Sequence, residues 1–391
     1  MTASDRSLGE ASHPTSKTAL ILTGGGARAA YQVGVLKAIE ELLPNPKVNP
    51  FPIICGTSAG AINAASIAAS AEDFGTGVNR LYSVWENFRA HHVYRADPIG
   101  IGWSGARWLS SLALGWITRD APKSLLDNLP LRQLVQASVD FDRIQHAIEN
   151  HALLSVSITC SGYSTGQSVS FFQGRADLEP WRRSQRVGAH VKLTLDHLMA
   201  SSAIPFVFPA VRINREWFGD GSMRQIAPIS PAIHLGANKI LVVGAGRLAD
   251  ENARPSSEIY PSLAQIAGHA LSSIFLDSLS VDLERARRIN QTLSMIPEAV
   301  LRERGSTLRP IDVLVIAPSE RLDRLAALHA GALPQSVRVM LRGIGAMNRQ
   351  GGALTSYLLF EQPYTRALLG LGYKDTMSRA PEVREFLGIQ D

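Results

Sequence analysis

The chain has 391 residues, of which 45% are hydrophobic and 19% are charged, a composition that excludes extensive disorder. Its formal net charge of +5 is small for this length, so it does not indicate a nucleic-acid partner and is equally compatible with an anionic membrane surface. Both cysteines, Cys55 and Cys160, lie in apolar runs, which suits a reducing compartment and does not indicate a disulfide framework.

The first 17 residues contain no apolar stretch of the kind that forms a secretory signal, and we expect them to form a short flexible tail. The protein is accordingly expected in the cytoplasm, with peripheral contact to the inner membrane surface. Residues 18–23 (TALILT) are apolar and lead into three glycines, which predicts a buried strand and a turn. In residues 30–43 the apolar side chains recur at helical spacing with Lys37 and Glu40 opposite, which predicts an amphipathic helix.

A charge-free stretch of 21 residues, 51–71, is long enough to cross a membrane as a helix. Pro52 and Asn63 interrupt it, and its first part is as apolar as a buried strand. We therefore interpret 51–55 as a strand and 59–71 as a helix rich in small residues. The resulting alternation of strands and helices favours an α/β fold with a mainly parallel central sheet.

Residues 74–150 break this alternation and are predicted to form a helical insert or lid. Within it, the segment 103–118 is apolar and rich in tryptophan, with basic residues around it. This composition suits contact with a membrane surface, and ordinary packing on the core is the alternative.

The later elements follow from the same patterns. In chain order we predict strands at 153–160 and 167–172, a helix at 194–202, and strands at 211–213, 216–218 and 239–244. The first two strands are expected to form a hairpin. Residues 245–391 are predicted to form a mostly helical extension packed on the core, with a long helix over 263–279 and one strand at 311–316. The main domain is then 18–244, preceded by the tail at 1–17.

The first motif with chemical meaning is at residues 56–60 (GTSAG), which match G-x-S-x-G between a predicted strand and a predicted helix. In this setting Gly56 and Gly60 allow a tight turn that exposes the hydroxyl of Ser58 above the sheet. The helix that follows directs N–H groups and a positive dipole end toward it. The pentapeptide alone fits a plain strand–helix turn equally well, and the context favours a nucleophilic serine.

A second turn between a strand and a helix, residues 24–28 (GGGAR), is rich in glycine. Its N–H groups can form an anion-binding nest or an oxyanion hole. A nucleotide-binding loop is the alternative, since Ala29 is small enough for a G-x-G-x-x-G/A fingerprint. The acidic residue expected about 20 residues later is missing, and so is a Gly-Lys-Ser/Thr sequence, which disfavours nucleotide binding.

The third motif is Asp220, which follows a short predicted strand and has glycine on both sides. Free backbone on both sides lets a carboxylate approach another loop closely. Taken alone, an aspartate in this setting is more often a β-turn residue.

These three motifs, in this order, resemble the patatin-like phospholipase family, and residues 200–205 (ASSAIP) are similar to the family's sequence before its aspartate. The resemblance covers roughly residues 18–244, a little over half of the chain. It implies a three-layer sandwich around the central sheet, with 18–244 as the catalytic domain.

The resemblance also implies a catalytic dyad. Ser58 would attack an ester carbonyl, while Asp220 would act as general base and then return the proton to the leaving group. Gly24, Gly25 and Gly26 would donate their N–H groups to the oxyanion.

The resemblance implies supporting residues too. Arg28 would lie beside the glycine loop, with a salt bridge to a structural carboxylate as the alternative, and Gly221 would support the aspartate. Two positions depart from the family pattern: Ala29 stands where the family usually has glycine, and Ser222 stands where it favours glycine or alanine. Neither departure removes a catalytic group.

A serine nucleophile usually transfers its proton to a histidine. His234, His269 and His329 follow the serine in the chain, but none lies in a loop of catalytic character, and the last two lie in apolar helical patterns. An aspartate that acts alone needs a raised pKa, which a poorly hydrated pocket provides.

The sequence contains no cluster of metal ligands, since the pair His91-His92 lacks carboxylates or cysteines at ligand spacing, and it contains no calcium loop. We therefore expect hydrolysis of phospholipid or lysophospholipid acyl esters without metal or cofactor. Acyl transfer to an acceptor other than water needs the same residues and stays an alternative. A non-catalytic lipid-binding regulator is disfavoured because Ser58 and Asp220 are both intact.

Overall fold

A computed structural model of the protein describes residues 17–95, 124–246, 263–274, 278–343, 345–346 and 352–389. The predicted tail and the tryptophan-rich segment 103–118 lie outside the described residues. The strands are β1 (Thr18–Leu22), β2 (Ile53–Thr57), β3 (Ser155–Gly162), β4 (Ser168–Gly174), β5 (Trp181–Arg183), β6 (Arg186–His190), β7 (Val211–Ile213), β8 (Glu216–Asp220), β9 (Lys239–Val243) and β10 (Asp312–Ile316).

The α-helices are α1 (Ala30–Leu42), α2 (Ala59–Ala68), α3 (Phe74–Glu86), α5 (Leu129–Ser138), α6 (Phe141–Glu149), α7 (Leu195–Ser201), α8 (Ser230–His234), α9 (Leu263–Ser272), α10 (Ser278–Ser294), α11 (Glu298–Glu303), α12 (Leu322–His329), α13 (Gln335–Gly343), α14 (Gly352–Leu358), α15 (Gln362–Met377) and α16 (Ala380–Leu387). Short 3-10 helices are η1 (Gly26–Ala29), η2 (Ala90–His92), η3 (Gly221–Arg224) and η5 (Ala330–Ala332). The segment predicted as one long helix contains α9 and the start of α10, and residues 275–277 between them lie outside the described part.

The described strands form one sheet with the order β10-β9-β1-β2-β3-β4-β6-β5, and β8 and β7 join it beside β3. All neighbours from β10 to β3 are parallel, and antiparallel pairing begins at the β3–β4 hairpin. The core strands β1, β2 and β9 are buried almost throughout, as parallel strands covered on both faces must be. The prediction of a mainly parallel central sheet is confirmed.

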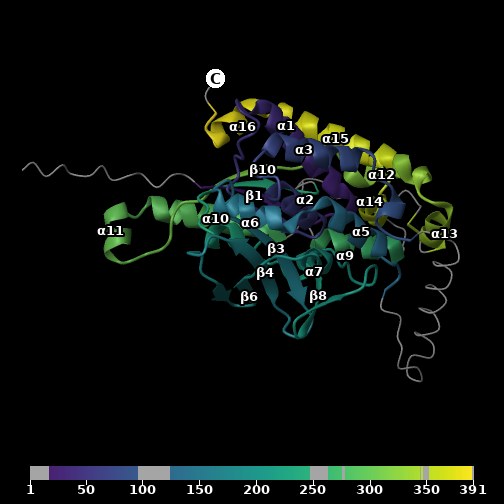
Figure 1. The fold of residues 1–391 in the computed structure, drawn as a ribbon, viewed down its shortest axis with the longest axis horizontal. Coiled ribbons are helices and arrows are strands. Elements are labelled where there is room, and N and C mark those ends of the chain that lie inside the picture. Colours follow the sequence, from purple (N-terminus) through teal and green to yellow (C-terminus); the bar gives the residue numbers. More distant parts are fainter. Residues whose placement is uncertain are drawn as a thin grey trace, which may run out of the picture.

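Successive side chains of the central strands enter two separate apolar cores because a strand directs its side chains to alternate faces. Leu20 and Leu22 belong to the core that contains α1, α2 and α3, whereas Ala19 and Ile21 belong to the core that contains α8 and part of α10. Figure 1 shows α1, α3 and α15 gathered on one side of β1 and β10. Helices therefore cover both faces of the sheet, which gives the three-layer sandwich.

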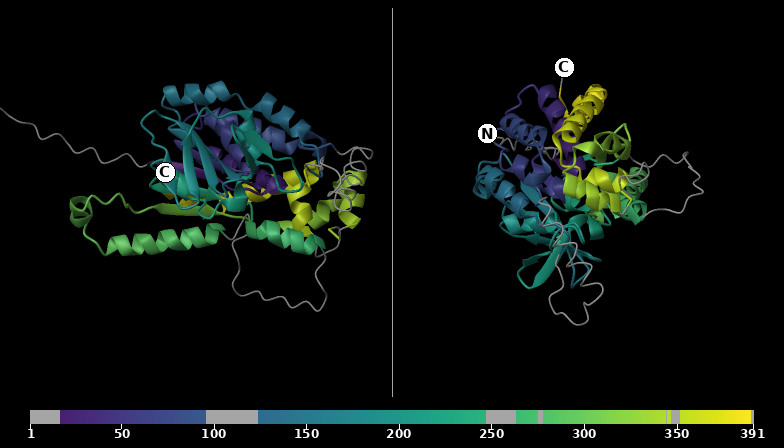
Figure 2. Two further views of the ribbon diagram at one scale, coloured as in Figure 1. Left: turned by 90° about the horizontal axis from the view of Figure 1, so that it is seen from below. Right: turned by 90° about the vertical axis from the view of Figure 1, so that its right-hand side faces the viewer.

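The C-terminal region is built into this sandwich. Strand β10 extends the parallel sheet beside β9, and α15 packs along α1. Gly34 of α1 and Gly372 of α15 bring the two backbones close, since a Cβ on either would overlap a carbonyl oxygen of the opposite helix. The last helices thus complete the outer layer, while α10 and α11 extend away from the body (Figures 1 and 2).

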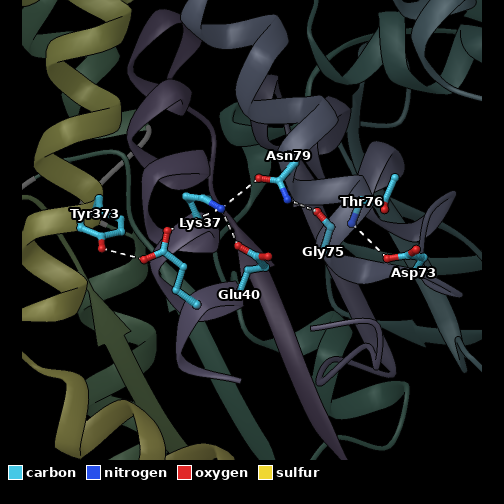
Figure 3. Close-up of polar contacts among 8 residues, drawn as sticks. Lys37, Glu40, Asp73, Gly75, Thr76, Asn79 and Tyr373 are labelled. Atoms are coloured by element: carbon cyan, nitrogen blue, oxygen red, sulfur yellow. Dashed lines mark hydrogen bonds and ion pairs between the residues drawn. The ribbon is translucent and has the colours of Figure 1, made fainter. Parts of the chain in front are cut away.

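Polar contacts at the surface join α1 to its two neighbouring helices (Figure 3). Lys37 Nζ donates hydrogen bonds to Glu40 Oε2 (2.7 Å) and to Asn79 Oδ1 of α3 (3.0 Å). Tyr373 Oη of α15 donates to Glu41 Oε2 (2.7 Å). Exposed pairs of this kind contribute little to stability, so the apolar packing holds these helices together.

The charge-free stretch 51–71 contains strand β2 and helix α2, both largely buried in the soluble-type core described above. Interpreting it as a strand followed by a helix is therefore confirmed. Within the described residues, no helix combines the length and the apolar run that crossing a membrane would need.

Candidate active site

The register of the sheet brings the carboxyl ends of β2 and β8 together. β2 pairs with β3 up to Thr57, opposite Thr159, and β4 occupies the other edge of β3. β8 continues along the edge that β2 leaves, with Asp220 opposite Cys160. The two strands therefore meet end to end, so that Ser58, the residue after β2, faces the last residue of β8.

The two predicted reactive groups are in direct contact. Ser58 Oγ donates a hydrogen bond to Asp220 Oδ2 over 2.5 Å, and both residues are only 1% exposed. The backbone N–H of Ser222 donates to the other carboxylate oxygen, Oδ1, over 2.9 Å. Burial raises the pKa of Asp220 to about 6, although the hydrogen bonds from Ser58 and Ser222 oppose the rise. The carboxylate is thus oriented, and its pKa lies near neutrality, where a general base works best.

Ser58 adopts a backbone conformation that residues other than glycine rarely take, with φ of 56°. Its N–H donates to Ser201 Oγ (2.9 Å), and that hydroxyl donates to the carbonyl of Thr159 (2.6 Å). Ser202 Oγ donates to the carbonyl of Ser58 (3.2 Å). The serines at the end of α7 therefore hold the strained turn in place, as strained residues at functional sites require.

The predicted supporting glycines lie where backbones touch. A Cβ on Gly60 would overlap the carbonyl of Leu22, and one on Gly221 would overlap the carbonyl of Thr159. Gly56 is similarly close to the backbone of α2. Their lack of a side chain lets β1, the serine turn and the aspartate turn pack against one another.

The glycine loop follows β1, the parallel neighbour of β2, and so lies at the same edge of the sheet as Ser58. Gly26 has a left-handed conformation (φ 55°) and no room for a Cβ beside the carbonyl of Tyr357. Gly26 and Ser58 line the same cavity. Toward the part of the chain that the structure describes, the N–H groups of Gly24 and Gly25 donate no hydrogen bond.

Arg28 is buried beside this loop, and its partners come from the C-terminal region. Its Nε donates to Ser356 Oγ (2.8 Å) and its Nη1 donates to Tyr357 Oη (3.1 Å). The guanidinium carbon also lies 3.9 Å from the centre of the Tyr357 ring, within cation–π range. Among the described residues it forms no ion pair with a carboxylate, so hydrogen bonds to α14 take the place of the alternative salt bridge.

A buried chain of hydrogen bonds joins the glycine loop to α2 and α3. Trp85 Nε1 donates to Asn63 Oδ1 (2.9 Å), and Asn63 Nδ2 donates to Gln32 Oε1 (3.1 Å) and to the carbonyl of Ala29 (3.2 Å). Gln32 Nε2 in turn donates to the carbonyl of Thr23, directly before the loop (2.7 Å). The sequence gave no signal for this network, because its members are separated in the chain and resemble ordinary helix residues.

Replacing Asn63 with alanine is expected to lower the free energy of unfolding by about 2–3 kcal/mol, because the buried groups of Trp85 and Gln32 then lose their partners. Urea denaturation measures the change. Asn87→Ala is the matched control, since its side-chain amide bonds the carbonyl of Ser83 at an exposed position and should change stability by about 0.5 kcal/mol at most. Equal losses in the two variants would contradict the importance of the buried network.

Ser58 lies at one end of a cavity of about 430 Å³. Apart from Gly26, Ser58 and Ser202 at this end, most lining side chains are apolar and come from α2, α3 and α5. A largely apolar cavity with a few convergent polar groups is typical of a site for a small molecule or a lipid chain.

The histidines that follow the serine in the chain lie elsewhere. His234 stacks on Trp181 with 4.9 Å between ring centres, and burial together with nearby arginines lowers its pKa to about 4. His329 lies near the ring of Tyr364, and His269 is exposed on α9. No histidine of the described residues forms a hydrogen bond with Ser58 or Asp220.

The fold and this site define a class of α/β protein in which a serine at a strand–helix turn contacts a buried carboxylate. Residues 20–233, more than half of the chain, match the family model described as patatin-like phospholipase. The chain belongs to the patatin-like phospholipase family, which confirms the resemblance, and this membership supports a lipid ester hydrolase.

Two curated relatives are phospholipases by name. The chain is 28% identical over 210 residues to the cGAMP-activated phospholipase of Pseudomonas aeruginosa, covering 54% of this chain and 53% of that protein. It is 51% identical over 53 residues to the cUMP-AMP-activated phospholipase of Escherichia coli, covering 14% of this chain and 17% of the relative. The chain thus spans about half the length of the first relative and less of the second.

Two solved structures were also found in the comparison. VipD of Legionella pneumophila aligns with 94% of this chain and 67% of its own at a TM-score of 0.35 and 13% identity. A chain of the ExoU–SpcU complex of Pseudomonas aeruginosa aligns with 88% of this chain and 70% of its own at a TM-score of 0.26 and 15% identity.

Proposed function

We propose that the protein is a serine ester hydrolase that cleaves acyl esters of phospholipids or lysophospholipids through an acyl-enzyme. The observation that carries the proposal is the 2.5 Å hydrogen bond from Ser58 to Asp220 at the closed end of an apolar cavity. Family membership and the phospholipase relatives support the same substrate class.

In the first half-reaction, Ser58 Oγ attacks the ester carbonyl carbon and its proton passes to Asp220 Oδ2. The N–H groups of Gly24, Gly25 and Gly26 stabilise the negative charge on the carbonyl oxygen. When the tetrahedral intermediate breaks down, the leaving alcohol takes the proton from the carboxyl group and the acyl chain stays on the serine.

In the second half-reaction, Asp220 accepts a proton from water while the water oxygen attacks the acyl-serine. The fatty acid leaves, and Ser58 regains its proton. The Ser222 N–H keeps Asp220 oriented in both steps, and the buried charge of Arg28 adds positive potential beside the glycine loop.

Labelling with a fluorophosphonate probe tests the nucleophile directly. We expect covalent labelling of the wild-type protein and none of Ser58→Ala, because only an activated serine reacts. Ser83→Ala, an exposed position on α3, is the control and should label fully. Undiminished labelling of Ser58→Ala would overturn the proposal.

A panel of phospholipids and lysophospholipids then defines the substrate. Each assay is run with and without cGAMP and cUMP-AMP, since the two relatives are named as activated by these molecules. Adding an alcohol or lysolipid acceptor separates hydrolysis from acyl transfer, because a transferase would form the new ester at the expense of free fatty acid.

A further inference from the structure

The cavity at Ser58 is elongated along helix α2. Ile62 and Ser66 follow Ser58 at intervals of four residues, so the three positions share one face of the helix, and all three line the cavity. At 1.5 Å per residue, the distance from Ser58 to Ser66 along the axis is about 12 Å. Ser70, just beyond the end of α2, also lines the cavity and continues the same direction.

The walls that face this stripe are apolar. Helix α3 contributes Leu81, Val84 and Trp85, and helix α5 contributes Leu131 and Leu134, among others. The hydroxyl of Ser66 is already satisfied by a hydrogen bond to the carbonyl of Ile62 (2.9 Å), so it requires no polar group from a ligand. The channel between the three helices therefore offers contact to hydrocarbon along its length.

The exposure of the lining residues changes from one end of the channel to the other. At the serine end, Ile204, Phe208 and Phe360 are at most 5% exposed. At the far end, Ser138 is half-buried and Arg80 is exposed. The channel is thus closed around the reactive serine and open to solvent at its far rim.

We propose that this channel holds the acyl chain of the substrate, with the ester at Ser58 and the methyl end directed toward the rim at Arg80, and that Ser66 and Val84 determine the accepted chain length. The inference rests on the proposed ester hydrolysis and adds the residues that select the substrate. Because the rim is open, chains longer than the channel extend into solvent, so long-chain esters are accepted. Each methylene buried in the channel contributes roughly fourfold to binding.

A bulky side chain at Ser66 should close the channel beyond the first part of the acyl chain. The experiment compares kcat/KM for p-nitrophenyl butyrate and p-nitrophenyl palmitate in the wild type and Ser66→Phe. We expect the palmitate-to-butyrate ratio to fall by about tenfold or more in the variant, since several methylenes lose their contacts. Val84→Phe narrows the channel from the opposite wall and should lower the ratio in the same way.

Ser83→Phe is the matched control, because it adds the same side chain to an exposed position of α3 outside the channel. Its ratio should stay within about twofold of the wild type. Thermal melting identifies a variant that has lost its fold, and the ratio is read from whichever of the two channel variants melts like the wild type. An unchanged ratio in a folded channel variant would overturn the inference. Failure of the proposed function has a different signature, since wild-type protein would then hydrolyse neither ester.

Discussion

The variant Asp220→Asn is expected to hydrolyse esters about 10³–10⁴ times more slowly than the wild type, because it removes the group that accepts the serine proton. Its fold should be intact. The amide oxygen can still accept the hydrogen bond from the Ser222 N–H, and the amide nitrogen can donate to Ser58 Oγ in place of the present bond. The hydroxyl would keep its position and lose its base.

The rate is measured with a short-chain p-nitrophenyl ester. Asp312→Asn, at an exposed position on β10, is the control for the loss of one carboxylate and should leave the rate unchanged. His234→Ala and His329→Ala should likewise retain activity. An active Asp220→Asn, together with an inactive histidine variant, would show that the protein uses a serine–histidine mechanism.

Much of the site could be predicted because its parts are local in sequence. The strands β1 and β2 are short apolar runs that end in glycine-rich turns, so the glycine loop and Ser58 were predictable with their neighbours. That the two turns lie side by side follows from parallel pairing of β1 and β2. The predicted β3–β4 hairpin is confirmed for the same reason, since two apolar runs are separated by a short polar turn.

The position of Asp220 could not be derived from local pattern, because it depends on β8 taking the edge of β3 that β2 vacates. Only the family resemblance pointed to this aspartate. The resemblance also singled out residues 200–205 but assigned no role to Ser201 and Ser202, whose bonds to Ser58 depend on the packing of α7 against the end of β2. The partners of Arg28 lie more than 300 residues away in the chain.

Some elements gave too weak a signal for prediction. Strands β5 and β6 are short, exposed and rich in arginine, so they lack the alternation that marks a strand. Helix α8 has five residues and begins near a proline, which reads as a turn. The membrane contact predicted for 103–118 stays a prediction, because that segment lies outside the described residues.

The second prediction with a large effect concerns pH, and it follows from the burial that raises the pKa of Asp220 from its ordinary value of 3.8 to about 6. Since the carboxylate must be ionised to accept the serine proton, kcat/KM should fall tenfold per pH unit below about pH 6 and level off above it. A profile that stays flat down to pH 4.5 would contradict Asp220 as the base.

The same pKa shift predicts that the active-site carboxylate destabilises the fold. Because the pKa of Asp220 is higher in the folded than in the unfolded chain, the folded state binds its proton more tightly. The stability due to this group is therefore present below about pH 4 and is lost as pH rises to about 6. The loss at pH 8 amounts to roughly 3 kcal/mol. Asp220→Asn should thus be more stable than the wild type, by about 1.5 kcal/mol less at pH 5 than at pH 8.

Urea denaturation of both proteins at these two pH values measures the difference, with Asp312→Asn as the control that should show no such dependence on pH. A gain in stability at pH 8 together with the loss of hydrolysis would mean that the protein retains a costly buried charge because the reaction requires it. A variant less stable than the wild type at both pH values would instead mean that the bond from Ser58 outweighs the cost of burying the carboxylate. The folded-state pKa of Asp220 would then lie below 3.8, and the pH profile of kcat/KM would shift down with it.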